Sequence, residues 1–274
     1  MTPANQNLLT RFLTALVMVP VMLAMLYKAP PVVFFGLVFL ATLVGGVEFF
    51  KMTHPEDRVA QWIGVATCAA VSLVVFFLGD DPRALVALLF GVPMVAILTP
   101  LWRLGDISTA AFRIAAAAFG PLWLGSMSLM PRFLAERGNT VGAGLVILTL
   151  AIGWIADTFG YFAGRFLGKH KLYPAVSPKK TVEGAVGAVF GATLSPVVIH
   201  FTILPSLPLG PAVALGLVAG AIGQMGDLGE SLLKRSTGIK DSGAIVPGHG
   251  GILDRMDAVM LVSTLVYLFT RFVM

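Results

Sequence analysis

The sequence predicts an all-α integral membrane protein that crosses the bilayer about nine times. Of its 274 residues, 57% are hydrophobic and only 12% are charged, and the mean hydropathy is +0.89. A soluble protein of this length has about 25% charged residues, so the composition favours lipid as the solvent. Each apolar run is near the roughly 20 residues that cross the hydrocarbon core, and the predicted spans are 9–27, 31–50, 59–78, 83–102, 108–130, 142–164, 184–203, 211–233 and 254–273.

The predicted spans divide into a plain N-terminal half and a C-terminal half with polar motifs. The first five spans are almost entirely apolar, with Glu48 and Arg113 as the charged exceptions. No stretch between spans is long enough to fold as a separate soluble domain. We therefore predict a single membrane domain over residues 1–274, with a helical half at 1–140 and the active site in the half at 141–274.

The distribution of basic residues predicts the orientation of the chain. With the N-terminus in the cytoplasm, 14 of the 19 Lys and Arg residues lie on the cytoplasmic side, as the positive-inside rule favours. The first apolar run has no convincing signal-peptidase site, so we interpret it as a retained span. The long polar loops at 165–183 and 234–253 then face the cytoplasm. This predicts a multi-pass protein of the cell (inner or plasma) membrane with a cytoplasmic active site.

Charge and cysteine content exclude several classes of function. The net charge is +5, but the basic residues lie in short loops between apolar runs, which fits membrane topology and anionic ligands rather than nucleic acid. The single cysteine, Cys68, rules out an intramolecular disulfide framework and a Cys-based zinc site.

The stretch from Asp227 to Asp257 carries the densest chemistry of the chain, and it reads DLGESLLKRSTGIKDSGAIVPGHGGILDRMD. Asp227 and Glu230 are three residues apart, as are Asp254 and Asp257, so each pair shares a helix face. Carboxylates beside Lys and Arg provide oxygen ligands for a hard divalent cation and counter-charges for a polyphosphate. The glycine cluster around His249 permits a close approach of backbone N–H groups to an anion.

Two upstream segments allow a structural or a functional interpretation. Asp157 lies inside a predicted span, where a carboxylate needs a metal, a proton or an ion pair, and Arg165 is the candidate ion-pair partner. The segment SPKKTVEG, at 177–184, is either a helix cap or a turn that binds phosphate at a helix N-terminus. His200 is isolated on an apolar face and is interpreted as a packed core residue.

The motifs in the C-terminal half resemble the signature of the phosphatidate cytidylyltransferases, the bacterial CDP-diacylglycerol synthases. The likeness runs without a change of spacing from Ser231 to Asp257, and Val246 replaces the Leu, Ile or Phe that the signature would lead us to expect. Upstream residues that also resemble the family are Asp157-Thr158, Tyr161, Gly164-Arg165, Gly168-Lys169 and Ser177-Pro178-Lys179-Lys180-Thr181-Val182-Glu183-Gly184.

This resemblance implies transfer of CMP from CTP to phosphatidic acid, with Mg²⁺, alone or with a second cation, giving CDP-diacylglycerol and pyrophosphate. It also implies a homodimer, by family likeness alone. The lipid phosphate is already an anionic nucleophile, so the chemistry requires positioning and charge stabilisation more than a strong base. The acyl chains are expected to enter sideways between spans from the cytoplasmic leaflet.

The resemblance and the residue chemistry together assign roles. Asp227 and Asp254 are the expected metal ligands, with Asp157 and Asp257 as further ligands or as residues that support them. The expected catalytic residues are Asp227, Asp254, Lys234, Arg235 and His249. The expected substrate-binding residues are Ser177, Lys179, Lys180, Thr181, Lys240 and Arg255.

Three other functions are less consistent with the sequence. A CTP-using polyprenol or phytol kinase would transfer the γ-phosphoryl group, and the signature argues against it. A transporter or channel would place acids at the membrane midplane in both halves, whereas here they gather in one. A CDP-alcohol phosphotransferase would carry a D-x-x-D-G-x-x-A-R motif, which is absent.

Overall fold

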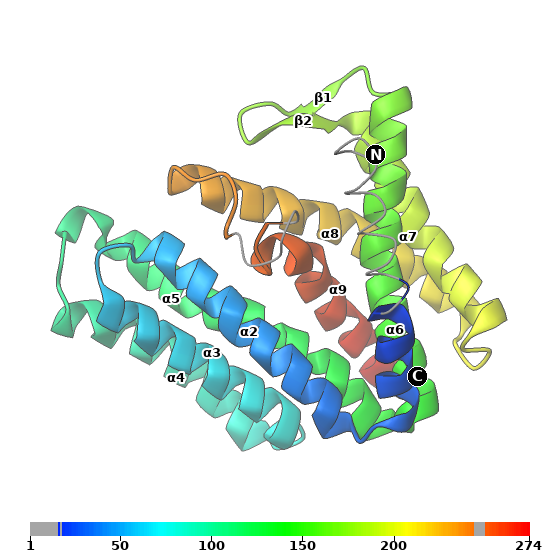
Figure 1. The fold of residues 1–274 in the computed structure, drawn as a ribbon, viewed down its shortest axis with the longest axis horizontal. Coiled ribbons are helices and arrows are strands. Elements are labelled where there is room, and N and C mark those ends of the chain that lie inside the picture. Colours follow the sequence, from blue (N-terminus) through cyan, green and yellow to red (C-terminus); the bar gives the residue numbers. More distant parts are fainter. Residues whose placement is uncertain (1–15, 17, 244–249) are drawn as a thin grey trace.

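The computed structural model describes residue 16, residues 18–243 and residues 250–274. Six helical segments are long and apolar enough to cross a membrane. They are Pro31–Thr53 (α2), Arg58–Leu78 (α3), Pro82–Trp102 (α4), the continuous run Ile107–Phe166, Val182–Thr202 (α7) and Leu209–Ser236 (α8). The chain is therefore a mostly helical protein of the kind that crosses a membrane several times (Figure 1).

The spans predicted at 31–50, 59–78, 83–102, 184–203 and 211–233 each coincide with one of these segments. The predicted spans 108–130 and 142–164 both fall in the run Ile107–Phe166, which contains η1 (Ile107–Thr109), α5 (Ala110–Gly125), η2 (Ser126–Ser128) and α6 (Leu129–Phe166). Within α6 the chain bends at Gly138, whose φ of 72° lies in the left-handed region open to glycine. The predicted division of the chain at 140/141 falls just after this bend.

The two terminal spans differ from the other predicted ones. The span predicted at 254–273 corresponds to α9 (Leu253–Phe272), which carries four charged residues and is not among the six apolar segments. Residues 9–15 and 17 of the span predicted at 9–27 lie outside the described residues, and the rest of it overlaps a short apolar helix at Met18–Lys28. The total of nine spans and the cytoplasmic N-terminus remain predictions.

The helices begin where local chemistry favours a helix start. Asp57 caps α3 by accepting hydrogen bonds from the backbone N–H groups of Val59 at 3.0 Å and Ala60 at 3.1 Å. Asp81 caps α4 in the same way, with Pro82 at its first position. Thr181 caps α7 by accepting from the N–H of Gly184 at 3.1 Å. This confirms the interpretation of the Ser177–Gly184 segment as containing a helix cap.

The expectation of an all-α fold needs one correction, because β1 (Lys171–Tyr173) and β2 (Ser177–Thr181) form an antiparallel hairpin. Pro178 holds the preceding residue in an extended conformation, and its carbonyl oxygen accepts a hydrogen bond from Lys171 Nζ at 2.7 Å. The Glu183 carboxylate joins the hairpin to α7 by accepting from His170 Nδ1 at 2.7 Å. The hairpin lies above α7 and α8 in Figure 1.

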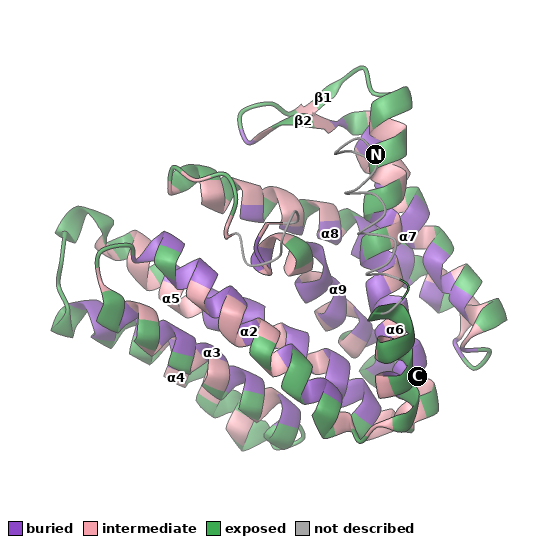
Figure 2. Cartoon of the chain, in the orientation of Figure 1, coloured by how far each residue is buried: buried purple, intermediate pink, exposed green. Residues whose placement is uncertain are grey.

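Helices α2 to α5 pack together in one group, and α6, α7 and α8 form a second group, with α9 between them (Figure 1). Buried side chains form one continuous core that includes residues of both groups (Figure 2). Glycines allow close packing in the second group: a Cβ added to Gly220 of α8 would lie 2.6 Å from the Cβ of Ala192 in α7. This packing sets α8 beside α7 and places the acidic residues of α8 near the hairpin.

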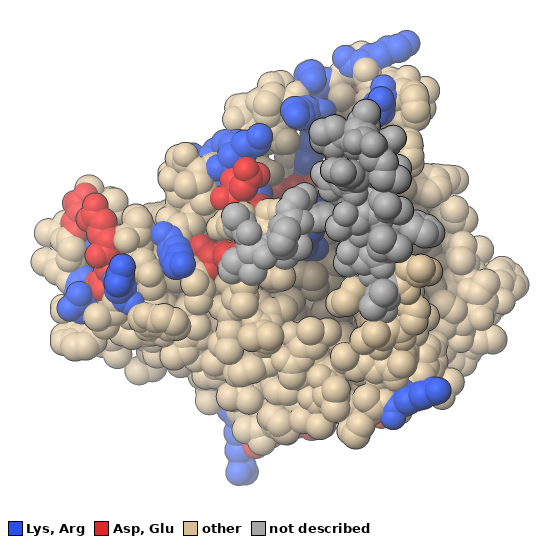
Figure 3. Space-filling view, viewed as in Figure 1, with Lys and Arg blue, Asp and Glu red and all other residues tan. Residues whose placement is uncertain are grey.

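The outer surface of the helices is apolar. Phe90 on α4 and Val186 on α7 are 64% and 65% exposed, as expected for helices that face lipid. Figure 3 shows charged side chains gathered over the hairpin and the loops beside α8, next to a broad surface without charge. The polar end of the molecule is therefore the end at which a water-soluble substrate can reach the protein.

A second group of charges holds α3, α6 and α9 together away from the hairpin. Arg132, whose side chain is 4% exposed, forms ion pairs with Asp80 at 2.7 Å and with Glu136 at 2.5 Å. Arg271 of α9 forms ion pairs with the same two acids. The hydrogen bonds from Arg132 and Arg271 hold the pKa of Asp80 below its ordinary value. This network fixes α9, which carries part of the site described below.

We predict that Arg132→Leu lowers the free energy of unfolding by about 3–5 kcal/mol, because it leaves Glu136 largely buried without its closest cation. Thermal unfolding of the detergent-solubilised protein measures the change. Arg83→Leu is the matched control, since Arg83 is exposed at the start of α4. Equal melting temperatures for the two variants would contradict the role given to Arg132.

Candidate active site

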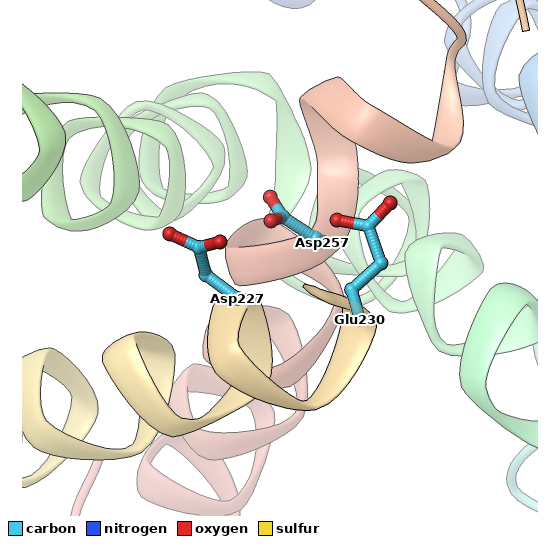
Figure 4. A group of neighbouring side chains, drawn as sticks. All are labelled: Asp227, Glu230 and Asp257. Carbon is cyan, nitrogen blue, oxygen red and sulfur yellow. The ribbon is translucent and has the colours of Figure 1, made fainter. Parts of the chain in front are cut away.

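Three carboxylates from two helices meet near the polar end of the molecule. Asp227 and Glu230 project from one face of α8, and Asp257 projects toward them from the first turns of α9 (Figure 4). Each offers one oxygen, and these oxygens lie within 4.8 Å of one another. We call these three residues the carboxylate cluster. It brings together two predicted metal ligands, Asp227 and Asp257, with Glu230, which shares the face predicted for Asp227.

The donor set of the carboxylate cluster fits a hard divalent cation. Three carboxylates at this separation repel one another, and the repulsion is stronger because Glu230 is only 2% exposed. A divalent cation prefers such oxygen ligands and offsets their charge. The cluster can therefore hold Mg²⁺ or a cation of similar preference.

Two lysines supply positive charge beside the cluster. Lys180, from strand β2, forms an ion pair with Asp227. Lys234 Nζ lies between two acids, 3.2 Å from Glu230 Oε1 and 2.6 Å from Asp254 Oδ1. Both lysine side chains are mostly buried. They place two cations where the oxygens of a bound phosphate could replace the carboxylates as partners.

Asp254, which was expected with Asp227 to bind the metal, lies beside the carboxylate cluster and contacts residues that precede α9. Its carboxylate pairs with Lys234 and accepts hydrogen bonds from the backbone N–H of Ser242 at 3.0 Å, the Ser242 hydroxyl at 2.9 Å and the N–H of Gly251 at 3.0 Å. Gly250 has a φ of +82°, a left-handed conformation that glycine adopts readily. Asp254 thereby fixes the start of α9. The first two turns of this helix carry Asp254 and Asp257.

Glu48 contributes to the site from the N-terminal half, and sequence reasoning did not include it among the site residues. Its carboxylate accepts hydrogen bonds from the N–H groups of Ile252 at 3.2 Å and Leu253 at 2.9 Å, and from the Ser242 hydroxyl at 3.4 Å. A carboxylate at a helix N-terminus satisfies free N–H groups and the helix dipole. Glu48 is 4% exposed. A charged exception in an apolar span was the signal that could have identified it.

The remaining expected site residues lie on the hairpin, at and after the end of α8, and in the first turn of α9. Arg235 connects the two, since its Nε lies 3.5 Å from the Val176 carbonyl oxygen and its Nη1 lies 3.4 Å from that of Ile239. Lys240 and Arg255 are exposed near the site. His249 lies outside the described residues. Ser177, Lys179 and Thr181 belong to β2, together with Lys180.

A cavity of about 360 Å³ whose lining includes several charged side chains, which we call the α6–α7 cavity, adjoins the carboxylate cluster. Asp227 of the cluster and its partner Lys180 both line it. Asp157 lines it as well and is not part of the cluster. The other lining residues are Gly160, Tyr161, Gly164, Arg165, Leu172, Lys179, Thr181, Gly184, Ala185 and Gln224.

An apolar groove of about 710 Å³, which we call the α5–α8 groove, adjoins the cluster from another direction. Its walls are aromatic side chains of α2 and α5 and aliphatic side chains of α8, and Glu230 of the cluster lines it. Gly226 and Gly229 leave the α8 wall shallow. Asp227 therefore faces the α6–α7 cavity and Glu230 faces an apolar groove. The carboxylate cluster lies at the junction of a space suited to a charged molecule and a space suited to a hydrocarbon chain.

We predict that Glu48→Ala lowers kcat/KM about 10- to 100-fold, in the range found when residues that support site ligands are removed. The cause is the loss of the acceptor that fixes the first N–H groups of α9. Glu56→Ala is the control, because Glu56 is an exposed acid in the loop that follows α2. Activity of Glu48→Ala equal to that of the control would show that the loop and α9 hold their positions without Glu48.

Comparisons with known proteins give the family of the chain. The model of the cytidylyltransferase family matches residues 9–273. The chain is 31% identical over 256 residues to the phosphatidate cytidylyltransferase of Staphylococcus aureus strain COL, covering 93% of this chain and 96% of the relative. It is 30% identical over 256 residues to the protein of that name from Staphylococcus epidermidis strain RP62A, with the same coverage. With the one from Staphylococcus saprophyticus it shares 34% identity over 197 residues, or 72% of this chain and 75% of that one.

Proposed function

Because the chain belongs to the cytidylyltransferase family, we propose that it is an enzyme that transfers the CMP group of CTP to phosphatidic acid, giving CDP-diacylglycerol and pyrophosphate. The reaction joins a highly charged, water-soluble nucleotide to a lipid with two acyl chains. The observation that supports this assignment best is the position of the carboxylate cluster between the α6–α7 cavity, which lysines and acids line, and the apolar α5–α8 groove.

The reaction sets an electrostatic problem for the site. An oxygen of the lipid phosphate attacks the α-phosphorus of CTP and forms the new P–O bond. The bond from the α-phosphorus to the oxygen that bridges to the β-phosphorus breaks, and its electron pair leaves with pyrophosphate. The nucleophile is already an anion, so no base has to remove a proton from it. The site must instead bring two anions together and stabilise the charge on the departing pyrophosphate.

The carboxylate cluster is the proposed metal site, held by Asp227, Glu230 and Asp257. A bound Mg²⁺ ion would supply positive charge to the phosphate oxygens in the transition state. Lys234 Nζ occupies the position between Glu230 and Asp254, so the second cation remains a prediction. In this proposal Asp254 keeps the start of α9 in place.

The basic residues bind and orient the two phosphate groups. Lys180 and Lys179 line the α6–α7 cavity beside Asp227, and we assign them to the triphosphate. Lys234 pairs with Glu230, which lines the α5–α8 groove, and we assign it to the lipid phosphate. Arg235 holds the hairpin to the end of α8 and so positions the lysines of β2. The roles expected for Ser177, Thr181, Lys240, Arg255 and His249 remain predictions.

The α5–α8 groove is the proposed site of the acyl chains. It is lined by side chains such as Phe112, Phe119 and Trp123 of α5 and Ile222 and Met225 of α8. Because these residues are as apolar as the bilayer interior, an acyl chain can pass from the membrane into the groove without exposure to water. An acyl chain in the groove would place its phosphate beside Glu230 and Lys234, at the carboxylate cluster.

We also propose that the cluster faces the cytoplasm of a cell whose inner or plasma membrane contains the protein. Cytosolic CTP must reach the α6–α7 cavity, and the basic hairpin loop fits the positive-inside rule. Dimer formation remains a prediction from family likeness.

A double-label assay tests the proposed reaction. The purified protein in detergent is given dioleoyl phosphatidic acid, Mg²⁺ and CTP labelled at either the α- or the γ-phosphate. We expect the α-label in the lipid and the γ-label in pyrophosphate, with no transfer after chelation of the metal. The γ-label in the lipid would identify a kinase instead, and no transfer of either label would contradict the proposal.

Gly229→Leu tests the acyl-chain groove. A Cβ at Gly229 meets no atom within 4 Å, so leucine can extend into the groove without a clash at that atom. We expect kcat/KM for dioleoyl phosphatidic acid to fall by about 10-fold or more, equivalent to roughly 1.4 kcal/mol, with a much smaller change for the dihexanoyl substrate. Gly36→Leu, an equally open position on the outer face of α2, is the control. An equal loss for both lipids would contradict this use of the groove.

A further inference from the structure

Two polar side chains in the α6–α7 cavity are not hydrogen-bonded within the part of the chain that the structure describes. Asp157 of α6 and Gln224 of α8 make no hydrogen bond or ion pair with described residues. Both line this cavity and also the small adjoining pocket between α6, α8 and α9. Polar groups within membrane helices are costly and are commonly retained for function. Their donors and acceptors are therefore available to a ligand.

The size and the lining of the cavity suit a nucleoside. Glycines of α6 and α7 form part of its wall: a Cβ at Gly164 would lie 3.1 Å from Thr181 Oγ1, and one at Gly184 would lie 3.0 Å from the same atom. Tyr161 provides an aromatic ring at the cavity, and Arg165 donates a hydrogen bond to its hydroxyl at 2.6 Å. A volume of about 360 Å³ lies at the small end of the range for ligand pockets and suits a nucleoside better than a diacyl lipid.

The charges of the cavity define the direction in which a nucleotide would bind. Lys180 and Asp227 lie where the cavity meets the carboxylate cluster, so the phosphates belong at that end. Asp157 and Gln224 line the same cavity, so the nucleoside of a nucleotide bound there would contact them. We propose that this cavity reads the cytosine ring, with the Asp157 carboxylate accepting from the exocyclic N4 amine and the Gln224 amide donating to N3 or O2. This inference rests on the proposed use of CTP.

Asp157 is the residue that distinguishes cytosine from uracil. Cytosine presents an amine at position 4, whereas uracil presents a carbonyl oxygen there. An ionised carboxylate has acceptors only, and acceptance from the cytosine amine is an established mode of base recognition. Gln224 cannot discriminate alone, because its amide carries both a donor and an acceptor and can turn over. Gln224 therefore orients the ring, and Asp157 selects it.

Asp157→Asn tests the proposal, because the new amide can turn its NH₂ group toward the uracil carbonyl. The measured quantity is the ratio of kcat/KM for CTP to that for UTP, with each nucleotide labelled at the α-phosphate. We expect the ratio to fall about 10- to 100-fold, the discrimination that one good base contact provides, and UTP turnover to be retained or raised. Asp106→Asn makes the same change in a cap outside the cavity and should leave the ratio unchanged.

Gln224→Leu is the second variant. It should raise KM for CTP and for UTP by similar factors. The variant loses the contact that orients the ring but keeps Asp157, which selects cytosine. A fall in kcat/KM by the same factor for both nucleotides in Asp157→Asn, with the ratio unchanged, would overturn the proposal and leave Asp157 with a structural or metal-binding role.

Binding measurements keep the inference testable if Asp157→Asn is folded but inactive. The α,β-methylene analogues of CTP and UTP bind without reacting, and the ratio of their dissociation constants reports the same selection. If the wild type binds the CTP analogue more tightly than the UTP analogue but transfers no CMP to lipid, the result would contradict the proposed reaction alone. A wild type that makes CDP-diacylglycerol, with an unchanged binding ratio in Asp157→Asn, would contradict the cytosine site alone.

Discussion

The mutual repulsion of three carboxylates between α8 and α9 is the constraint on which the rest of the site depends. Their oxygens lie within 4.8 Å of one another and Glu230 is buried, so the arrangement is stable only with cations beside it. Lys180 and Lys234 provide some of this charge, and a divalent cation would provide the rest. The close glycine packing of α7 against α8 and the hairpin carry Lys180 to this position. The positive charges that stabilise the carboxylate cluster are also the charges that two bound phosphate groups require.

The N-terminal half contributes by fixing the helix that carries Asp257. Glu48 is separated in sequence from its N–H donors at Ile252 and Leu253 by 204 and 205 residues. At the other end of α9, Arg132 and Arg271 share the acids Asp80 and Glu136. These two sets of contacts hold α9 from both ends against helices of the other half. The groove beside α5 then places an apolar surface of the N-terminal half next to acids of the C-terminal half.

The sequence predicted those features that depend on residues close together in the chain. Hydrophobic run length located five of the spans, and the three-residue spacing of Asp227 and Glu230 placed them on one face. Contacts between distant residues could not be predicted from the sequence. The role of Glu48 depends on a contact across most of the chain. Gln224 became a candidate only because it lines the same cavity as Asp157. The hairpin was missed because Ser-Pro-Lys-Lys-Thr also has the composition of a helix start. Asp254 was expected to bind the metal and Asp257 to be a further ligand or a supporting residue, yet the structure places Asp257 in the cluster and pairs Asp254 with Lys234, Ser242 and Gly251.

Direct binding of a divalent cation to the purified protein tests the central claim, that the carboxylate cluster is a metal site. Titration with Mn²⁺, followed by its electron paramagnetic resonance signal without substrates, measures affinity independently of activity. We predict that Asp227→Asn and Asp257→Asn each weaken binding by at least about 10-fold, or roughly 1.4 kcal/mol. Asp106→Asn, outside the cluster, should bind like the wild type. Wild-type affinity in a variant that carries both cluster substitutions would contradict the account.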